Sequence, residues 1–368
     1  MPVPDPLFLT GGNFIIGLLL GCLLFRSDFC MAAMLRDFFL FRDVSLLRAF
    51  LFYLILSAPL FLLAAAAASP SPFPPHTLGP AAMTTLAGGI LFGLGMVLAG
   101  GCVIGTIYRM AAGNLTYWIG FSGILLGSMI YAETHPQVQE IAVKTRITDT
   151  VVLFQDREET RIILILLLSI LGGAALVSPA GRTLFRTTGF ALGYIRPWKA
   201  VLALALLNAS YYLFSGSPMG VTTAYAKLAG YLENLVAPHH VAGLEYFQSS
   251  SISWQMGDIL MEGGAGPRVD FISYTELPLV IGTFTGSLLT ALYYREFRIY
   301  GLPPLRQGVA ALLGGILLAM GARIASGCNV KFFLGAMPLL AYQGIFFFIA
   351  AAAGAFLGTR ILTRFVIR

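Results

Sequence analysis

Nine apolar runs, each long enough to cross a lipid bilayer, divide this chain of 368 residues. They lie at about 10–26, 46–68, 82–101, 114–132, 162–178, 199–215, 277–294, 306–326 and 341–363. Because 57% of the residues are hydrophobic and only 11% are charged, a soluble fold would lack the polar surface to cover them. We therefore predict an all-α integral membrane protein that forms a single membrane domain.

The segments between these runs are short. A Pro- and Ser-rich linker spans 69–80, a charged segment spans 133–160, and a longer insert spans 216–276. None is large enough to form a separate soluble domain. The four cysteines lack the spacing of a metal site and the four histidines follow no ligand pattern, so we expect neither a metal nor a cofactor.

Positive charges gather in alternate loops, which predicts an orientation in the membrane. With the N-terminus outside, fifteen cations fall on the cytoplasmic side: Arg26, Arg36, Arg42, Arg48, Arg109, Arg182, Arg186, Arg196, Lys199, Arg295, Arg298, Arg306, Arg360, Arg364 and Arg368. Six fall outside: Lys144, Arg146, Arg157, Lys227, Arg268 and Lys331. The sequence therefore predicts an N-out, C-in protein, and its net charge of +6 reflects topology rather than nucleic-acid binding.

Two of the apolar runs repeat each other at an offset of 226 positions. Gly88, Gly89, Gly95, Gly101 and Cys102 correspond to Gly314, Gly315, Gly321, Gly327 and Cys328. Each run is interrupted at its Gly-Cys pair, and a cation follows each interruption, Arg109 in the first and Lys331 in the second. The chain is therefore expected to consist of two related halves, each built around a broken helix that carries a thiol.

The order of the spans predicts that these halves are inverted with respect to each other. Residues 1–132 form the first half, 133–198 a linker segment with the fifth span, and 199–368 the second half, which starts from the opposite side of the membrane. Cys102 then approaches the midplane from the cytoplasmic side and Cys328 from the outer side. Since non-helical backbone at this depth requires cover by protein or water, Gly101 and Gly327 mark a protein-lined centre.

A third interruption, in "FRSDFCMAAMLRD", follows the first span. Its apolar stretch is too short to cross the membrane, which predicts a re-entrant short helix that brings Cys30 to the same centre. The corresponding place in the second half, "FSGSPMGVTTAYAK", offers the thioether of Met219 instead. We expect two ion pairs to close the loop, Asp28 with Arg26 and Asp37 with Arg36.

Thiols at helix interruptions favour a small anion with a soft end. Sulfur is polarisable and a weak hydrogen-bond donor, while the free N–H groups of a helix start and a nearby cation attract negative charge. The candidate pathway residues are Cys30, Cys102, Cys328, Gly101, Gly327, Arg109, Lys331 and Asn329.

Several of these residues also have purely structural interpretations. Cys22, among leucines, is expected to be an apolar filler. For Gly89, Gly93 and Gly315, close helix packing is the preferred interpretation. Arg109 and Lys331 could equally be interfacial anchors. Arg323, at the end of a span, requires a partner or a pore.

Three motifs, "FRSDFCMAAMLRD", "GGCVIGTIYRMAAGN" and "SGCNVKFFLGAMP", resemble in order the cysteine motifs of the YeeE/YedE family of bacterial inner-membrane sulfur-compound transporters. The resemblance covers nearly the whole chain. It implies an hourglass-shaped protein with central short helices that takes up thiosulfate through a narrow waist, passing it between the thiols of Cys30, Cys102 and Cys328 by S–H···S hydrogen bonds.

The insert and the overall length resemble the YedE branch of that family, whose members are linked to selenium metabolism, so a selenium-containing anion is an alternative substrate. Members of the family often work beside a small TusA-like sulfur-carrier protein, which would dock at the Arg-rich cytoplasmic face. Apart from membrane lipid, we expect no other partner and no nucleic acid.

A third possibility is a membrane sulfurtransferase with Cys102 as its nucleophile. Such an enzyme needs a base or cation that forms the thiolate in a wet site. No histidine or carboxylate lies close enough in sequence to serve, so a transporter rather than an enzyme is the preferred interpretation.

Overall fold

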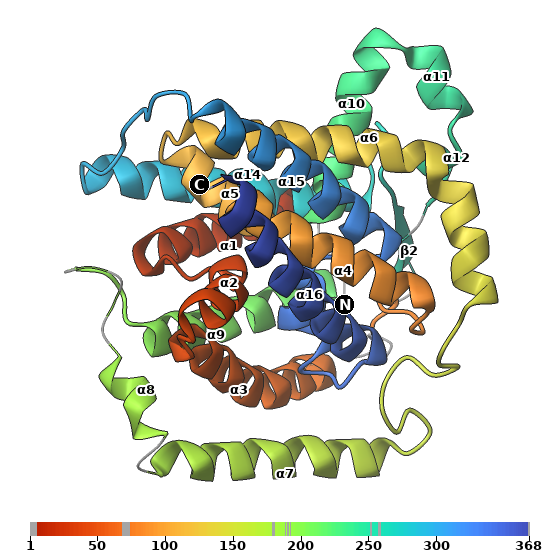
Figure 1. The fold of residues 1–368 in the computed structure, drawn as a ribbon. Coiled ribbons are helices and arrows are strands. Elements are labelled where there is room, and N and C mark those ends of the chain that lie inside the picture. The colour runs from red at the N-terminus through yellow and green to blue at the C-terminus, as the bar shows by residue number, and fades with distance from the viewer. Residues whose placement is uncertain are drawn as a thin grey trace.

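The structure is a computed structural model that describes residues 6–67, 74–178, 181–187, 189, 191, 193–250, 252–256 and 259–366 (Figure 1). Part of the predicted 69–80 linker and Arg368 lie outside these residues. The first half and the linker contain α1 (Pro6–Ser27), α2 (Met31–Phe41), α3 (Ser45–Ala67), α4 (Met83–Leu98), α5 (Val103–Ala111), α6 (Leu115–Lys144), α7 (Glu158–Val177) and α8 (Arg182–Arg186). The remainder contains α9 (Pro197–Ser215), α10 (Thr222–Val236), α11 (Pro238–Gly243), α12 (Glu245–Gln248), β1 (Ile252–Met256), β2 (Ile259–Gly263), α13 (Phe271–Tyr274), α14 (Glu276–Tyr293), α15 (Leu305–Ile324), the π-helix η1 (Val330–Ala336), α16 (Tyr342–Ile361) and the π-helix η2 (Leu362–Val366).

Among the described residues, eight helical stretches are long and apolar enough to cross a membrane. They correspond to eight of the nine predicted spans. The ninth, predicted at 199–215, is also helical, and α9 packs against α1 and α3 inside the bundle. The prediction of an all-α integral membrane protein is thereby confirmed.

Two segments differ from the sequence prediction. The span expected at 114–132 continues as helix to Lys144, where Lys144 pairs with Glu140 one turn earlier and α6 runs through Pro136. The 216–276 insert, for which the sequence analysis proposed no secondary structure, contains the helices α10 to α13 and an antiparallel hairpin in which β1 pairs with β2. Hydropathy predicts only the part of a helix that crosses the membrane. The polar end of α6 and the elements of the insert are determined by local hydrogen bonds instead.

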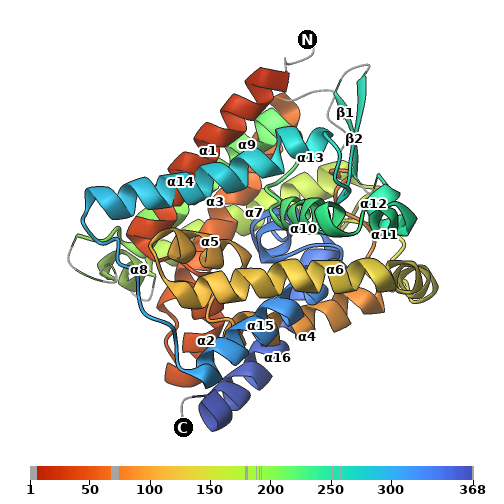
Figure 2. The ribbon, with the colours of Figure 1, turned by 90° about the horizontal axis from the view of Figure 1, so that it is seen from above.

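The long helices alternate in direction, so the molecule has two opposite faces. We name the face where α1 begins the N-terminal face and the face where α16 ends the C-terminal face (Figure 2). At the N-terminal face, Ala82 before α4 bridges Arg146 after α6. At the C-terminal face, Asn114 before α6 bridges Tyr300 before α15.

Helices of the first half pair with helices of the second half in a reciprocal manner. α1 packs along α14 while α9 packs along α3, α4 packs along α16 while α15 packs along α6, and α4 and α15 contact each other. This exchange is the pattern expected of two halves related by a two-fold axis.

Glycines allow these helices to approach closely. A Cβ atom at Gly93 would overlap the carbonyl of Ala351, one at Gly315 would overlap the carbonyl of Gly120, and one at Gly89 would lie 2.7 Å from the Cβ of Ala350. The predicted packing role of these three glycines is confirmed.

Four backbone interruptions place short helices near the middle of the bundle. Residues with positive φ occur at Asp28 (46°), Gly100 (72°), Gly216 (65°) and Ser326 (62°), and the following helices are α2, α5, α10 and η1. Gly100 and Ser326 are related by the same 226-position offset as the cysteines, so the repeat extends to the backbone conformation. The re-entrant short helix predicted after the first span is α2.

Candidate functional site

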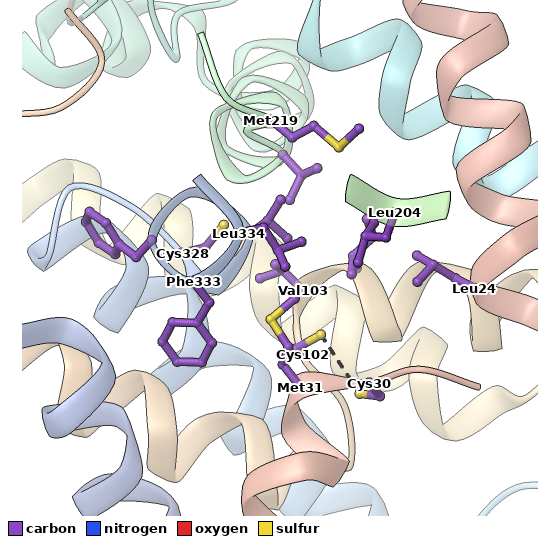
Figure 3. Packing of buried hydrophobic residues seen from close by; sticks show 14 of the residues in the cluster. Leu24, Cys30, Met31, Cys102, Val103, Leu204, Met219, Cys328, Phe333 and Leu334 are labelled. Atoms are coloured by element: carbon purple, nitrogen blue, oxygen red, sulfur yellow. Dashed lines mark hydrogen bonds between the residues drawn. The ribbon is translucent and has the colours of Figure 1, made fainter. Parts of the chain in front are cut away.

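Cys30 and Cys102 meet at the centre of the molecule. Cys30 immediately precedes α2, and Cys102 immediately precedes α5, where its sulfur accepts the N–H of Gly105 at 3.4 Å. Both side chains are buried, and their Sγ atoms lie 3.9 Å apart (Figure 3). Both cysteines are free, so the pair makes an S–H···S contact rather than a disulfide.

Cys328 is also buried but lies apart from this pair. It precedes η1, and its carbonyl accepts the N–H of Phe332 at 2.8 Å. In Figure 3 the side chains of Val103 and Leu334 stand between Cys328 and the paired cysteines. On the other side, Cys328 lies beside Thr222 at the start of α10.

Asn329 brings a polar side chain into this apolar centre. It is fully buried, and its Nδ2 donates to the sulfur of Met31 at 3.2 Å. Its amide lies beside Cys102, while its Oδ1 has no hydrogen-bond partner. Because leaving a buried polar atom unpaired costs about 1–3 kcal/mol, this oxygen is unusual in a well-packed core.

The space beside Cys102 is narrow. A cavity of about 10 Å³ lies here, no larger than a single water site. It is lined by Leu20, Leu24, Phe29, Met31, Cys102, Ile104, Leu204, Met219, Val330 and Leu334. Met219 therefore reaches the same centre as Cys102, as its place in the second half predicted. We name this constriction the waist; in the present conformation it is closed to an anion.

A much larger cavity, of about 330 Å³, opens toward the N-terminal face. We name it the vestibule. Its walls come from the start of α4, the second half of α6, the loop before α10 and the end of α15. Ser326, Gly327 and Lys331, which flank Cys328, line it as well, so the vestibule ends close to the third cysteine, which is itself buried behind its wall.

Three cations line the vestibule, Arg146, Arg323 and Lys331, of which the last two lie nearest to Cys328 in the sequence. Arg323 donates to Tyr246 Oη at 3.1 Å and also to Thr222 Oγ1, and Lys331 Nζ donates to the carbonyl of Ser326 at 2.7 Å. Arg323 thus has both the partners and the cavity that its position in a span required. Lys331 is placed where it could meet an anion approaching Cys328.

Arg109 has a different environment. It donates to the carbonyl of Gly100 and to Tyr117 Oη, each at 2.9 Å, and pairs with Asp28 at 3.0 Å. Asp28 also accepts a hydrogen bond from Tyr108 at 2.7 Å. Arg109 therefore ties the interruption before α5 to the one before α2, directly beside the Cys30–Cys102 pair.

The predicted pairing of Asp28 with Arg26 is wrong. Arg26 instead pairs with Glu296 at 3.0 Å and stacks over the ring of Tyr294. Sequence neighbours suggested the wrong partner because the left-handed turn at Asp28 directs its carboxylate toward α5. The predicted pair of Arg36 and Asp37 does form, at 2.8 Å.

The remaining candidates occupy distinct places. A Cβ atom at Gly101 would lie 3.1 Å from the ring of Tyr117, and one at Gly327 would lie 2.7 Å from Lys331 and 2.8 Å from Phe332, so a larger residue at Gly327 would displace these two side chains. Cys22 donates to the carbonyl of Gly286 at 3.4 Å on the contact between α1 and α14, away from the waist.

One group of potential metal ligands occurs among the described residues: Glu133, Glu233 and His240. Each ring nitrogen of His240 already contacts one of the carboxylates, at 2.9 and 2.8 Å. These contacts account for the cluster without an ion. It lies outside the vestibule and the waist.

Sequence reasoning missed Glu276, Thr222 and Tyr225. Glu276 is buried in the vestibule wall, and Tyr225 Oη donates to the carbonyl of Val103 at 3.0 Å, next to Cys102. The sequence signal that could have revealed Glu276 was its charge at the start of an apolar run. Ionisable residues within membrane spans usually have a functional role.

Taken together, the fold and the site define a multi-pass membrane protein in which half-length helices from both parts of the chain meet around buried thiols beneath a cation-lined cavity. The profile of the Sulphur transport family matches residues 26–357. The chain belongs to this family, which confirms the YeeE/YedE resemblance.

Two relatives are similar to this chain over most of their length, and a third is similar over a part of it. The Thiosulfate transporter TsuA of Spirochaeta thermophila is 28% identical over 338 residues, covering 89% of this chain and 92% of the relative. TsuA of Escherichia coli is 28% identical over 364 residues, covering 90% and 88%. The Probable transporter YedE of Salmonella typhimurium is 33% identical over 166 residues, but this match covers only 45% of this chain and 37% of the relative. The matches to the two TsuA proteins therefore cover most of this chain, whereas the match to YedE covers less than half of it.

Proposed function

We propose that this protein carries thiosulfate across the bacterial inner membrane into the cytoplasm. One observation carries the proposal: the vestibule ends beside the residues that flank Cys328, and the Cys30–Cys102 pair lies deeper in the same bundle at a closed waist. The names of the two full-length relatives supply the substrate.

In the proposed orientation the N-terminal face is periplasmic and the C-terminal face is cytoplasmic. The vestibule then receives the anion, and Arg323 and Lys331 attract it. The two halves act as inverted repeats, at 1–132 and 199–368, joined by the 133–198 segment with the fifth span. A TusA-like sulfur carrier would meet the anion at the Arg-rich cytoplasmic face.

The anion passes the waist without covalent chemistry. Its terminal sulfur accepts an S–H hydrogen bond first from Cys328, then from Cys102 and then from Cys30, while Asn329 donates to an oxygen. The buried Oδ1 of Asn329 lacks a partner, and turning this amide toward the anion gives up only its contacts with the sulfur atoms of Met31 and Cys102. Met31, Met219 and Leu334 have to move aside, because the waist cavity is too small for the ion.

The residues around Cys102 favour transport of the anion over enzymatic sulfur transfer. The waist lining contains no histidine, lysine or carboxylate that could take a proton from Cys102. A selenium-containing anion remains the alternative substrate, because a soft donor would also accommodate selenium. Competition of selenite or selenosulfate with thiosulfate distinguishes the two substrates.

The test is uptake of radiolabelled thiosulfate into liposomes that contain the purified protein. Cys30→Ala, Cys102→Ala and Cys328→Ala should each abolish uptake, because each removes the soft donor at one step and leaves the anion without a partner there. The matched control is Cys22→Ala, which removes a thiol at the α1–α14 contact and should leave uptake near the wild-type rate. An active Cys328→Ala with an inactive Cys22→Ala would refute the assignment of the pathway.

A further inference from the structure

Glu276 is a buried carboxylate in the wall of the vestibule. It is the first residue of α14, and only 8% of its surface is exposed. Its Oε2 accepts the backbone N–H groups of Thr223 and Ala224, each at 3.1 Å, in the first turn of α10. A buried carboxylate held by helix-start amides can exist in the ionised form even without a directly bound cation.

The other oxygen, Oε1, faces Gly220, where any Cβ atom would overlap it. The chain thus provides a glycine where this carboxylate needs room. None of the salt bridges found among the described residues involves Glu276, and Gly220 lines the vestibule together with it. The negative charge is therefore balanced by amides and by cations farther away.

Several titratable groups face Glu276 or share its cavity. They are Arg323 from α15, Lys331 from η1, Cys328 before η1, Tyr211 from α9, Tyr225 and Lys227 from α10, Tyr131, His135 and Arg146 from α6 and its end, Tyr246 from α12, and His76. Arg323 and Lys331 are the cations that interact with Glu276 most directly. An anion attracted to the vestibule would engage the same two cations.

We propose that Glu276 takes up a proton when an anion binds in the vestibule, so that anion binding is linked to pH. The proposal rests on the proposed function, which supplies the anion. A dianion that engages Arg323 and Lys331 removes their compensation of the Glu276 charge and adds a repulsive charge nearby. Protonation of Glu276 at Oε1, by a proton taken up from the bulk solution, removes both the uncompensated charge and the repulsion between carboxylate and dianion.

This linkage has a directional consequence. The vestibule binds its anion more tightly when the solution at the N-terminal face is more acidic. A dianion that binds together with one proton adds a net charge of −1 to the protein instead of −2. Its inward movement is therefore opposed less strongly by an inside-negative membrane potential.

The experiment is thiosulfate binding to the purified full-length protein in detergent, measured by calorimetry between pH 5.5 and 8.5. For the wild type we expect affinity to fall with rising pH, by up to about tenfold per pH unit for one linked proton. Glu276→Gln should bind independently of pH, with the wild-type affinity of low pH, because its amide carbonyl still accepts both α10 amides. Glu140→Gln, which removes an exposed glutamate at the end of α6, is the matched control and should keep the wild-type pH profile.

Two further measurements test whether the linked proton binds to Glu276. If Glu276→Gln does not fold, proton uptake by the wild type on addition of thiosulfate, followed with a pH-indicator dye, tests the linkage directly. If His135→Gln abolishes the pH dependence while Glu276→Gln keeps it, the proton belongs to His135 and the proposal is overturned. Binding without any pH dependence or proton uptake overturns it as well but leaves the proposed function standing, whereas absence of thiosulfate binding at every pH removes both.

Discussion

Lys227→Met should loosen the 264–270 segment of the insert, which Lys227 attaches to α10. Lys227 is fully buried, and its Nζ donates to the carbonyls of Gly266 and Arg268 and pairs with Asp270, at 2.7, 2.8 and 2.8 Å. Methionine retains most of the aliphatic stem but removes all three hydrogen bonds. The Asp270 side chain, only 7% exposed, then keeps only the more distant guanidinium of Arg268, at 4.0 Å.

The magnitude follows from these contacts. Breaking a buried ion pair by removing one partner costs about 3–5 kcal/mol. Asp270 keeps the N–H of Gly264 at 3.0 Å and that of Ile272 at 3.0 Å, so we expect the lower end of this range. A loss of about 3 kcal/mol raises the population of the open segment more than 100-fold, because about 1.4 kcal/mol corresponds to a factor of ten.

Hydrogen exchange followed by mass spectrometry measures this change. Amides of the 264–270 segment should exchange more than 100-fold faster in Lys227→Met, while those of α4 and α16 should not change. Lys144→Met is the matched control: its ion pair with Glu140 is exposed and is worth at most about 1 kcal/mol. Adding Asp270→Asn to Lys227→Met should restore part of the protection, since no unpaired charge remains. Unchanged protection in Lys227→Met, or an equal effect of Lys144→Met, would refute the reasoning.

Two other predictions concern topology and mechanism. Reporter domains fused after positions 150 and 190 should lie on opposite sides of the membrane, with position 190 in the cytoplasm; the same side for both would eliminate the inverted repeat. Intact-protein mass spectrometry after turnover should find no sulfur added to Cys102 or Cys328, and Cys→Ser at one of these sites should retain partial uptake. A trappable persulfide on either residue would favour the sulfurtransferase interpretation instead.

The sequence predicted those features correctly that depend on a local pattern or on the internal repeat, and it failed for contacts between distant segments. The interruption at Cys30 was predictable because nine or so apolar residues between charges cannot cross a bilayer. The repeat predicted corresponding interruptions before Cys102 and Cys328, and the structure places a positive φ at Gly100 and at Ser326, although one is glycine and the other serine. The partner of Asp28 was not predictable, since a single left-handed residue decides which helix its carboxylate meets.

In the vestibule, too, the sequence indicated one important residue but not the contacts that it makes. Arg323 was recognised as a charge in a span that required a partner, but the partners, Tyr246 and Thr222, come from the insert, whose sequence lacks periodicity. Glu276 escaped notice because it stands at the edge of an apolar run, where a carboxylate usually lies at the membrane surface. Only the position of α10, with its first amides turned toward Glu276, makes this residue part of the cavity.

By itself, the sequence determined the membrane environment, the helical spans, the repeat and the cysteines that interrupt it, because hydrocarbon requires every backbone group to be satisfied within long apolar helices. Only the tertiary structure decided that Cys30 and Cys102 touch while Cys328 stands apart, that the waist is closed, and that Arg109 braces two interruptions whereas Lys331 lines a cavity. The physical reason is that these relations arise between segments far apart in the chain. Their distances are set by close glycine-lined helix contacts and by a few backbone turns, not by the local pattern of residues.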